Sequence, residues 1–457
     1  MRRDILRMAW PVFIGQLAVM INGVIDTVMA GRLSAVDMAA IGVGASVYIT
    51  VHIGLMGTLL GLSPIVAQHF GAGRREEIGE TFRQALWLAL MLSLPGCVAL
   101  AWTEPWLALS APPEEVAALA RTYLWATAAG LPAALLFRAF HALNTAISRP
   151  HIVMYINLAG VALKVPLNGL FIHGFAPIGL DPMGGAGCGV ATSIVAWASA
   201  LLAVAWLALD RAYAPFALLR WCRPERHRMG ELLRLGVPIG ASYLVEITSF
   251  TFMALFLARL GAEASASHQI ASNLTGVCYM GGLGIASATS TLVAQKIGAG
   301  DLPLARRYAL AGLRLAAMLA LGSAGLLWFA ATPIANAYTA SRSVVAATMP
   351  LIWAVGVFHV FDSLQTQFGF ILRAYKIATA PMVVYVLAMW GIGLGGGYWL
   401  TFVADPGTAA GALRGEVVGA LGFWVAGIAS LLVTTAGLGW LLVRCWRAER
   451  RDGISLP

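Results

Sequence analysis

Long apolar runs, interrupted by few or no charged residues, follow one another along almost the whole chain. A helix needs about 20 mostly apolar residues to cross a bilayer. We count twelve runs of roughly this kind and expect a spanning helix in each. They are Met8–Gly31, Met38–Gly73, Gln84–Thr103, Thr122–Phe137, Pro150–Leu180, Pro182–Leu209, Leu235–Ala258, Ala264–Gln295, Leu315–Ser341, Ser343–Leu372, Ile377–Ala404 and Val417–Val443.

The runs favour helices over the strands of a membrane barrel. Barrel strands would appear as segments of about ten residues with alternating hydrophobicity. Here small and large residues mix with helical periodicity, and the connections are short. Glycine pairs such as Gly57 and Gly61, four residues apart, fit close helix packing. The sequence therefore predicts an all-α polytopic membrane protein.

Composition excludes a water-soluble protein. The chain is 59% hydrophobic and only 11% charged, with a mean hydropathy of +0.79, whereas soluble domains carry about 25% charged residues. The amino-terminal run has no signal-cleavage pattern. The five dispersed cysteines contain no Cys-x-x-Cys pair, so neither a disulfide framework nor a zinc site is indicated. We expect no cofactor.

The basic residues set the expected orientation. Of the 30 Lys and Arg residues, 23 fall on the side of the membrane that holds both termini, and five fall in the opposite loops. The positive-inside rule therefore places both termini in the cytoplasm. The net charge of +9 reflects this bias. Because the basic residues are scattered among apolar spans, we expect no nucleic-acid partner.

The chain contains an internal repeat. Residues 67–73 read AQHFGAG, and residues 294–300 read AQKIGAG, at an offset of 227 residues. The same offset aligns Pro11 with Pro238 and Arg32 with Arg259. We therefore expect two parallel six-helix units, at residues 1–210 and 235–457, joined by a basic cytoplasmic linker at 211–234. Transport sites lie between repeats of this kind in secondary transporters.

Three lone acidic residues lie within the apolar runs: Asp26, Glu246 and Asp362. A charge at bilayer depth costs at least about 2.5–3.5 kcal/mol on insertion scales, so such residues usually mark an ion or substrate path. A buried acid satisfied by neighbouring hydroxyls is the alternative interpretation. Like-charge proximity and desolvation would let Glu246 and Asp362 carry protons, and oxygen ligands would equally suit sodium.

These motifs resemble those of the multidrug and toxic compound extrusion (MATE) family, NorM-type branch. Residues 25–33, IDTVMAGRL, are similar to its first helix, and the Ala-Gln-x-x-Gly-Ala-Gly repeat is similar to its repeat. The resemblance implies two lobes forming a V. It also implies efflux of small, mainly cationic drugs in exchange for Na+ or H+ across the bacterial inner membrane, with no enzymatic reaction. We expect a monomer in the lipid bilayer.

The resemblance also implies site residues. Glu246 and Asp362 sit where the NorM-type branch carries its cation-binding acids, and a sodium ion there is the hypothesis we favour. Tyr279 matches an aromatic residue that faces the cation in that branch. His359 lies three residues before Asp362, on the same helix face, so it either lines a polar cleft or takes part in proton coupling.

The fifth span departs from the family pattern. Asn157, Lys164 and Asn168 form one polar stripe at helical spacing, with no carboxylate. Some other branches use an acid in this helix, so a complete proton site of that type is not expected. We predict that Lys164 faces Asp26, because a buried ammonium needs a counter-charge. The alternative is that Lys164 snorkels or points into water and does not meet Asp26.

Two other function classes stay open. A flippase of lipid-linked saccharides has a related architecture, but its cavity should be rich in Arg and Lys, and only Lys164 and Arg314 fall within spans. An intramembrane enzyme would need clustered catalytic groups, whereas these acids are spread along the chain. There is no Walker motif, so transport by this chain would be secondary or use a separate motor.

Overall fold

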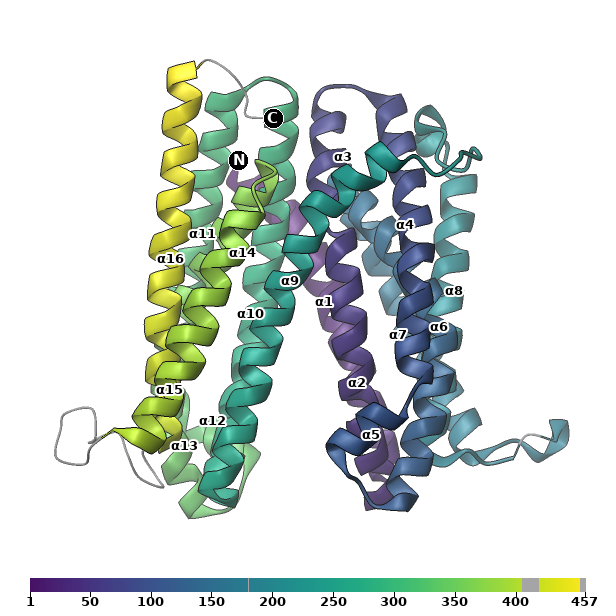
Figure 1. The fold of residues 1–457 in the computed structure, drawn as a ribbon, viewed down its shortest axis with the longest axis vertical. Helices are drawn as coiled ribbons and strands as arrows, with labels where there is room; N and C mark the ends of the chain where they lie inside the picture. Colours follow the sequence, from purple (N-terminus) through teal and green to yellow (C-terminus); the bar gives the residue numbers. More distant parts are fainter. Residues whose placement is uncertain (180, 405–418, 453–457) are drawn as a thin grey trace. The chain divides into compact units, whose positions relative to one another are not determined.

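A computed structural model describes residues 1–179, 181–404 and 419–452. Within these ranges the regular elements are helices. Twelve helical segments are long and apolar enough to cross a membrane, so the protein is a multi-pass membrane protein (Figure 1). The expected twelve-span, all-α fold is confirmed.

The first half of the chain supplies six of these spans, with short helices between them. Its elements are α1 (Arg2–Gly31), α2 (Ala35–Leu59), α3 (Leu62–Gly71), α4 (Arg75–Ala101), α5 (Glu104–Ser110), α6 (Glu114–Ala146), α7 (Pro150–His173), η1 (Ala176–Ile178), η2 (Gly184–Ala186), α8 (Gly187–Leu209) and η3 (Arg211–Phe216). The α2–α3 pair forms one span.

The second half supplies the other six. Its elements are α9 (Arg226–Leu257), η4 (Ala258–Leu260), α10 (Ala262–Gly298), α11 (Leu302–Phe329), α12 (Ala331–Tyr338), α13 (Arg342–Ala374), α14 (Thr379–Tyr385), η5 (Val386–Gly395), α15 (Gly396–Tyr398), η6 (Trp399–Val403) and α16 (Gly419–Asp452). The span at Thr379–Val403 contains two π-helical stretches, η5 and η6.

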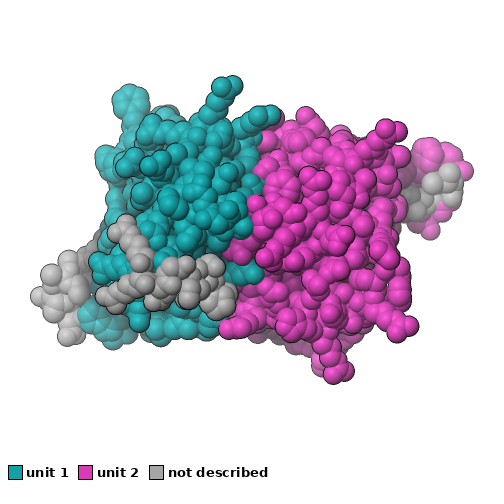
Figure 2. Space-filling view, turned by 90° about the horizontal axis from the view of Figure 1, so that it is seen from above, with its two compact units in different colours: residues 1–9, 241–457 teal, residues 10–240 magenta. Residues whose placement is uncertain are grey.

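The described chain forms two compact units, which Figure 2 colours separately. One unit holds residues 10–240, and the other holds residues 1–9 and 241–457. In the first, α6 packs against α2, α4 and α8; in the second, α13 packs against α10, α11 and α16. Both α1 and α9 contribute residues to both units.

The repeat seen in the sequence is also a repeat of backbone structure. Gly73 and Gly300 both have positive φ, at 73° and 76°. The amides of Ala72 and Ala299 donate to the carbonyls of Gln68 and Gln295, at 2.9 and 3.0 Å. Glycine suits this left-handed conformation because it has no Cβ. The two copies of the motif therefore end their helices by the same turn.

The Gly57–Gly61 pair lies against α9 within the first unit. A Cβ added to Gly57 would lie 2.4 Å from the Cα of Gly240, and one added to Gly61 would lie 2.9 Å from the amide of Gly236. The expected close helix packing is confirmed, because any side chain at these positions would collide with backbone.

The linker is held against the first unit. The Gln84 side chain donates to the carbonyl of Arg223 and accepts from the amide of Glu225, each at 2.8 Å. The Trp87 indole donates to the carbonyl of Cys222 at 3.0 Å. Helix α9 begins at Arg226, inside the segment that the sequence analysis treated as linker.

Candidate cation and substrate sites

Asp26 lies on α1 and is buried, with 7% of its surface exposed. Its Oδ1 lies 3.0 Å from the Lys164 ammonium and accepts a hydrogen bond from the Asn168 amide at 2.7 Å. Lys164 is 2% exposed and Asn168 is fully buried. The pairing of Lys164 with Asp26 expected from the sequence is present, and the alternative of a lysine in water is wrong.

The polar stripe on α7 positions this group. Asn157, two turns before Lys164, donates to the carbonyl of Gly15 on α1 at 3.2 Å. Asn168 lies one turn after Lys164 on α7, and its amide donates to Asp26, which is also on α1. The residues at this helical spacing therefore fix α7 along α1 at two levels, with Lys164 between them.

Glu246 and Asp362 lie in the second unit, on α9 and α13. Asp362 is 4% exposed and accepts a hydrogen bond from Gln365 at 3.0 Å. Glu246 is half-buried, and its carboxyl group interacts electrostatically with both Asp362 and Arg373. Although the two acids are 116 positions apart in the sequence, the fold brings them within electrostatic range of each other.

Tyr279 on α10 belongs to the same neighbourhood. Its charged and polar neighbours are Glu246, Asp362, Tyr243 and Arg373. The sequence placed Tyr279 near the acids only through the family resemblance, and the fold puts it there. An aromatic face and two carboxylates are groups that attract a cation.

His359 is almost fully buried on α13, and its Nδ1 has no hydrogen-bond partner. It is one turn from Asp362, on the same helix. Nearby, the rings of Phe358 and Trp424 meet edge to face at 5.3 Å. A linked proton-transfer role for His359 stays a prediction.

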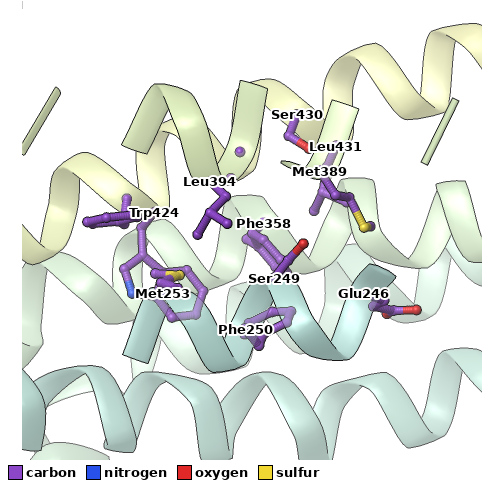
Figure 3. Close-up of a pocket in the computed structure, with 13 residues that line it drawn as sticks. Glu246, Ser249, Phe250, Met253, Phe358, Met389, Leu394, Trp424, Ser430 and Leu431 are labelled. Carbon is purple, nitrogen blue, oxygen red and sulfur yellow. The ribbon is translucent and has the colours of Figure 1, made fainter. Parts of the chain in front are cut away.

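Beside the acids, side chains of α9, α13, η5 and α16 line a cavity of about 50 Å³ (Figure 3). Glu246 is the acidic residue in its lining. The other lining residues are small, aliphatic, aromatic or sulfur-containing: Ser249, Phe250, Met253, Phe358, Met389, Gly393, Leu394, Phe423, Trp424, Gly427, Ser430 and Leu431. An apolar wall with one carboxylate matches the chemistry of an amphipathic cation. The volume is far below the roughly 300–1,000 Å³ of ligand pockets, so a drug-sized guest requires a wider state of this cavity.

Sequence reasoning did not identify this lining, although one signal was available. Glu246, Phe250 and Met253 are spaced by four and three residues, so they share one face of α9. The contributions of η5 and α16 depend on tertiary packing. Trp390 of η5 donates to the hydroxyl of Thr248 on α9 at 3.2 Å, two residues after Glu246.

Arg373 is a second residue that sequence reasoning did not assign to the site. It was counted only as a cytoplasmic charge, but it lies in the last turn of α13. Its guanidinium lies over the rings of Phe370 and Tyr243, at 4.5 and 5.0 Å, and donates to the Tyr243 hydroxyl at 3.2 Å. The positive group next to the acid pair is therefore held in place by aromatic rings.

The family model that matches the chain is MatE, over residues 11–170 and 238–399. The two matched segments start at Pro11 and Pro238, the residues that the repeat offset aligns. The chain belongs to the MATE family. Both copies of the repeat therefore correspond to the family's own unit.

Relatives of the same family cover nearly the whole chain. The "Probable multidrug resistance protein NorM" of Aromatoleum aromaticum is 41% identical over 435 residues, which cover 95% of this chain and 92% of that protein. The "Multidrug resistance protein NorM" of Vibrio cholerae is 32% identical, with coverage of 99% and 97%. The "Multidrug resistance protein PmpM" of Pseudomonas aeruginosa is 35% identical, with coverage of 92% and 89%.

Solved structures share the fold. The crystal structure of a MATE protein in a bent conformation matches with a TM-score of 0.87 at 18% identity, covering 99% of this chain and 97% of that one. The eukaryotic MATE transporter AtDTX14 matches with a TM-score of 0.85 at 16% identity, with coverage of 96% and 95%. At these identities the likeness establishes the fold.

Proposed function

We propose that this MATE-family protein is a secondary multidrug exporter that expels amphipathic organic cations in exchange for Na+. The observation that carries the proposal is the position of Glu246. Its carboxylate lies in the wall of an apolar, aromatic cavity and interacts electrostatically with Asp362. One charged group can thus serve both a drug cation and a coupling ion.

The acid pair supplies the coupling chemistry. A desolvated sodium ion takes oxygen ligands, and carboxylates with neighbouring hydroxyl and carbonyl groups provide them. Two neighbouring carboxylates also repel each other, which favours the binding of a cation or a proton between them. Competition between this ion and a drug cation for Glu246 would link export of one to entry of the other.

Alternating access would then carry the drug outward. The protein would reside in the bacterial cytoplasmic membrane as a monomer, with both termini in the cytoplasm, since Lys and Arg are concentrated on that side. Flipping of lipid-linked saccharides is less consistent with the cavity, because its described lining includes no Lys or Arg to hold a pyrophosphate.

The test is ethidium transport by purified protein in liposomes with imposed gradients. A sodium gradient should drive ethidium against its concentration, and Glu246→Gln protein, inserted in equal amount, should not respond. Transport driven by a pH gradient and indifferent to sodium would assign proton coupling instead. Absence of transport under either gradient would refute secondary export.

A further inference from the structure

The Lys164 ammonium has every one of its hydrogen-bond donors occupied. Besides Asp26, it donates to the carbonyl of Cys188 at 3.2 Å and to the hydroxyl of Thr192. An ammonium group has three N–H donors and no acceptor. Two of the three partners lie on α8 and only one is the carboxylate. Lys164 would therefore keep most of its hydrogen bonds if Asp26 were taken by another cation.

The acceptor oxygens around Asp26 are incompletely used. The side-chain oxygens of Asn168 and Asn22 are both buried and have no hydrogen-bond partner. Asn168 is bonded to Asp26 through its amide nitrogen, and Asn22 lies one turn before Asp26 on α1. A buried polar group without a partner costs roughly 1–3 kcal/mol. These two oxygens fit the N–H donors of a guest.

The wall next to the pair is apolar. Cys188, whose carbonyl holds Lys164, packs in one buried cluster with Ala30, Ile41, Tyr123 and Ile172. Met29 is packed against the same cluster. A guest that reaches Asp26 would thus meet an aromatic ring, aliphatic side chains and sulfur atoms beside the carboxylate.

We propose that Lys164 is a built-in competitor that sets the charge selectivity of the amino-terminal unit. In the resting protein its ammonium occupies the place that an organic cation takes on Asp26. The guest displaces the ammonium from Asp26, and the ammonium keeps its hydrogen bonds to Cys188 and Thr192. The N–H groups of the guest then donate to the side-chain oxygens of Asn22 and Asn168. This inference rests on the proposed export of organic cations and names a second site for them.

The exchange has a direct consequence for selectivity. A neutral compound cannot replace the ammonium, because the carboxylate would then be left buried without a counter-charge. A cation with N–H donors gains both the carboxylate and the two free amide oxygens. The structure thus favours protonated amines and aryl amine cations over neutral compounds of the same size.

The experiment measures binding of ethidium and of neutral Nile red to purified protein in detergent at pH 8. Lys164→Met should bind ethidium roughly 10-fold more tightly, a typical coupling between sites that compete, and should bind Nile red as the wild type does. In Asp26→Asn, ethidium binding should weaken. In Asp26→Asn protein, adding Lys164→Met should change nothing further, because the competition needs the carboxylate.

Two controls separate charge competition from a structural role. Ser93→Ala removes a buried hydrogen bond within α4, from the Ser93 hydroxyl to the Leu90 carbonyl at 2.7 Å, so ethidium binding should stay at the wild-type level. Lys164→Gln provides a second neutral variant with hydrogen-bonding capacity, should Lys164→Met fail to fold. The double variant leaves no unpaired charge, so it must fold if Lys164 is not a folding determinant.

The proposal is overturned if the effects of the two substitutions add, if ethidium and Nile red change together, or if all variants at Lys164 fail to fold, including the double variant. If wild-type protein binds no organic cation at all, the proposed function fails instead. If it binds ethidium without any dependence on Lys164, only the competition at Asp26 fails.

Discussion

The two halves of this protein repeat one helical unit, but the acids within their spans have opposite surroundings. In the amino-terminal unit, Asp26 is neutralised by Lys164 at 3.0 Å. In the carboxy-terminal unit, neither Glu246 nor Asp362 has an ion-pair partner among the described residues. The first acid is held in a direct ion pair, whereas Glu246 has the Arg373 guanidinium only within electrostatic range.

The repeat makes the difference more specific. At the offset of 227 residues, Asp26 aligns with Met253, which lines the cavity beside Glu246. The anchors on either side, Pro11 with Pro238 and Arg32 with Arg259, hold this alignment. Where one half has an acid, the other has a soft apolar side chain. Duplication has conserved the helices while their interior chemistry has diverged.

We expect the largest effect on transport from substitutions that break the carboxy-terminal acid pair. Glu246→Gln and Asp362→Asn should each abolish efflux, because one remaining acid cannot hold the coupling cation. The measurement is ethidium efflux from cells that express equal amounts of inserted protein. Ser323→Ala on α11, which does not line the cavity and loses only hydrogen bonds to Leu319 and Ala320 of its own helix, is the matched control. Wild-type efflux by either acid variant would remove these residues from the coupling site.

The second largest effect is on thermal stability and is expected when the amino-terminal ion pair is broken. Removing one partner of a buried ion pair typically costs 3–5 kcal/mol, whereas removing both is often nearly neutral. Lys164→Met should therefore lower the melting temperature in detergent strongly, and Asp26→Asn combined with Lys164→Met should recover most of the loss. A double variant less stable than either single variant would contradict the account of a mutually compensating pair.

The third effect tests what the halves share. Gly73→Ala and Gly300→Ala force a Cβ into the left-handed region, which costs about 1–2 kcal/mol. Nothing else lies within 4 Å of either added Cβ. The two substitutions should thus lower the free energy of unfolding equally. A clearly larger loss at one position would show that the two turns are not equivalent.

The smallest effect concerns a contact of the first unit alone, outside the spans. The backbone N–H of Ala212 and the guanidinium of Arg149, at 2.6 Å, lower the pKa of Asp210 below its ordinary value. Its contribution to stability is full above the ordinary pKa and is lost as the pH falls through the lowered pKa. Because the pair is partly exposed, we expect less than about 1 kcal/mol.

Melting curves of wild-type and Asp210→Asn protein between neutral pH and pH 3 check this. The gap between them should close as the pH falls. A gap that widens toward low pH would have the wrong sign for a carboxyl group with a lowered pKa.

The spans and the repeat could be predicted from the sequence because lipid imposes length and composition directly on each helix. Lone acids such as Asp26 could be recognised for the same reason, and Asp26 was the one carboxylate within an apolar run of the half that contains Lys164. The cavity around Glu246 could not be predicted in full. Phe250 and Met253 share its helix face, but Trp424 reaches the cavity through tertiary packing.

Arg373 and the π-helical segment η5 show a second limit. A charged residue near the end of an apolar run, such as Arg373, is easily assigned to a loop. Its position over the rings of Tyr243 and Phe370 depends on the packing of the helices. The π-helical stretch at Val386–Gly395 has no distinct hydropathy pattern, because it is apolar throughout. Such features arise from contacts between elements, which periodicity does not encode.

The most direct test of the central claim is ethidium transport in proteoliposomes under a sodium gradient at equal pH on both sides. We predict accumulation that follows the sodium gradient, disappears in Asp362→Asn protein, and persists in Ser323→Ala protein, in which only hydrogen bonds within α11 are lost. Accumulation that ignores sodium, or that survives in Asp362→Asn protein, would contradict coupling at the Glu246–Asp362 pair.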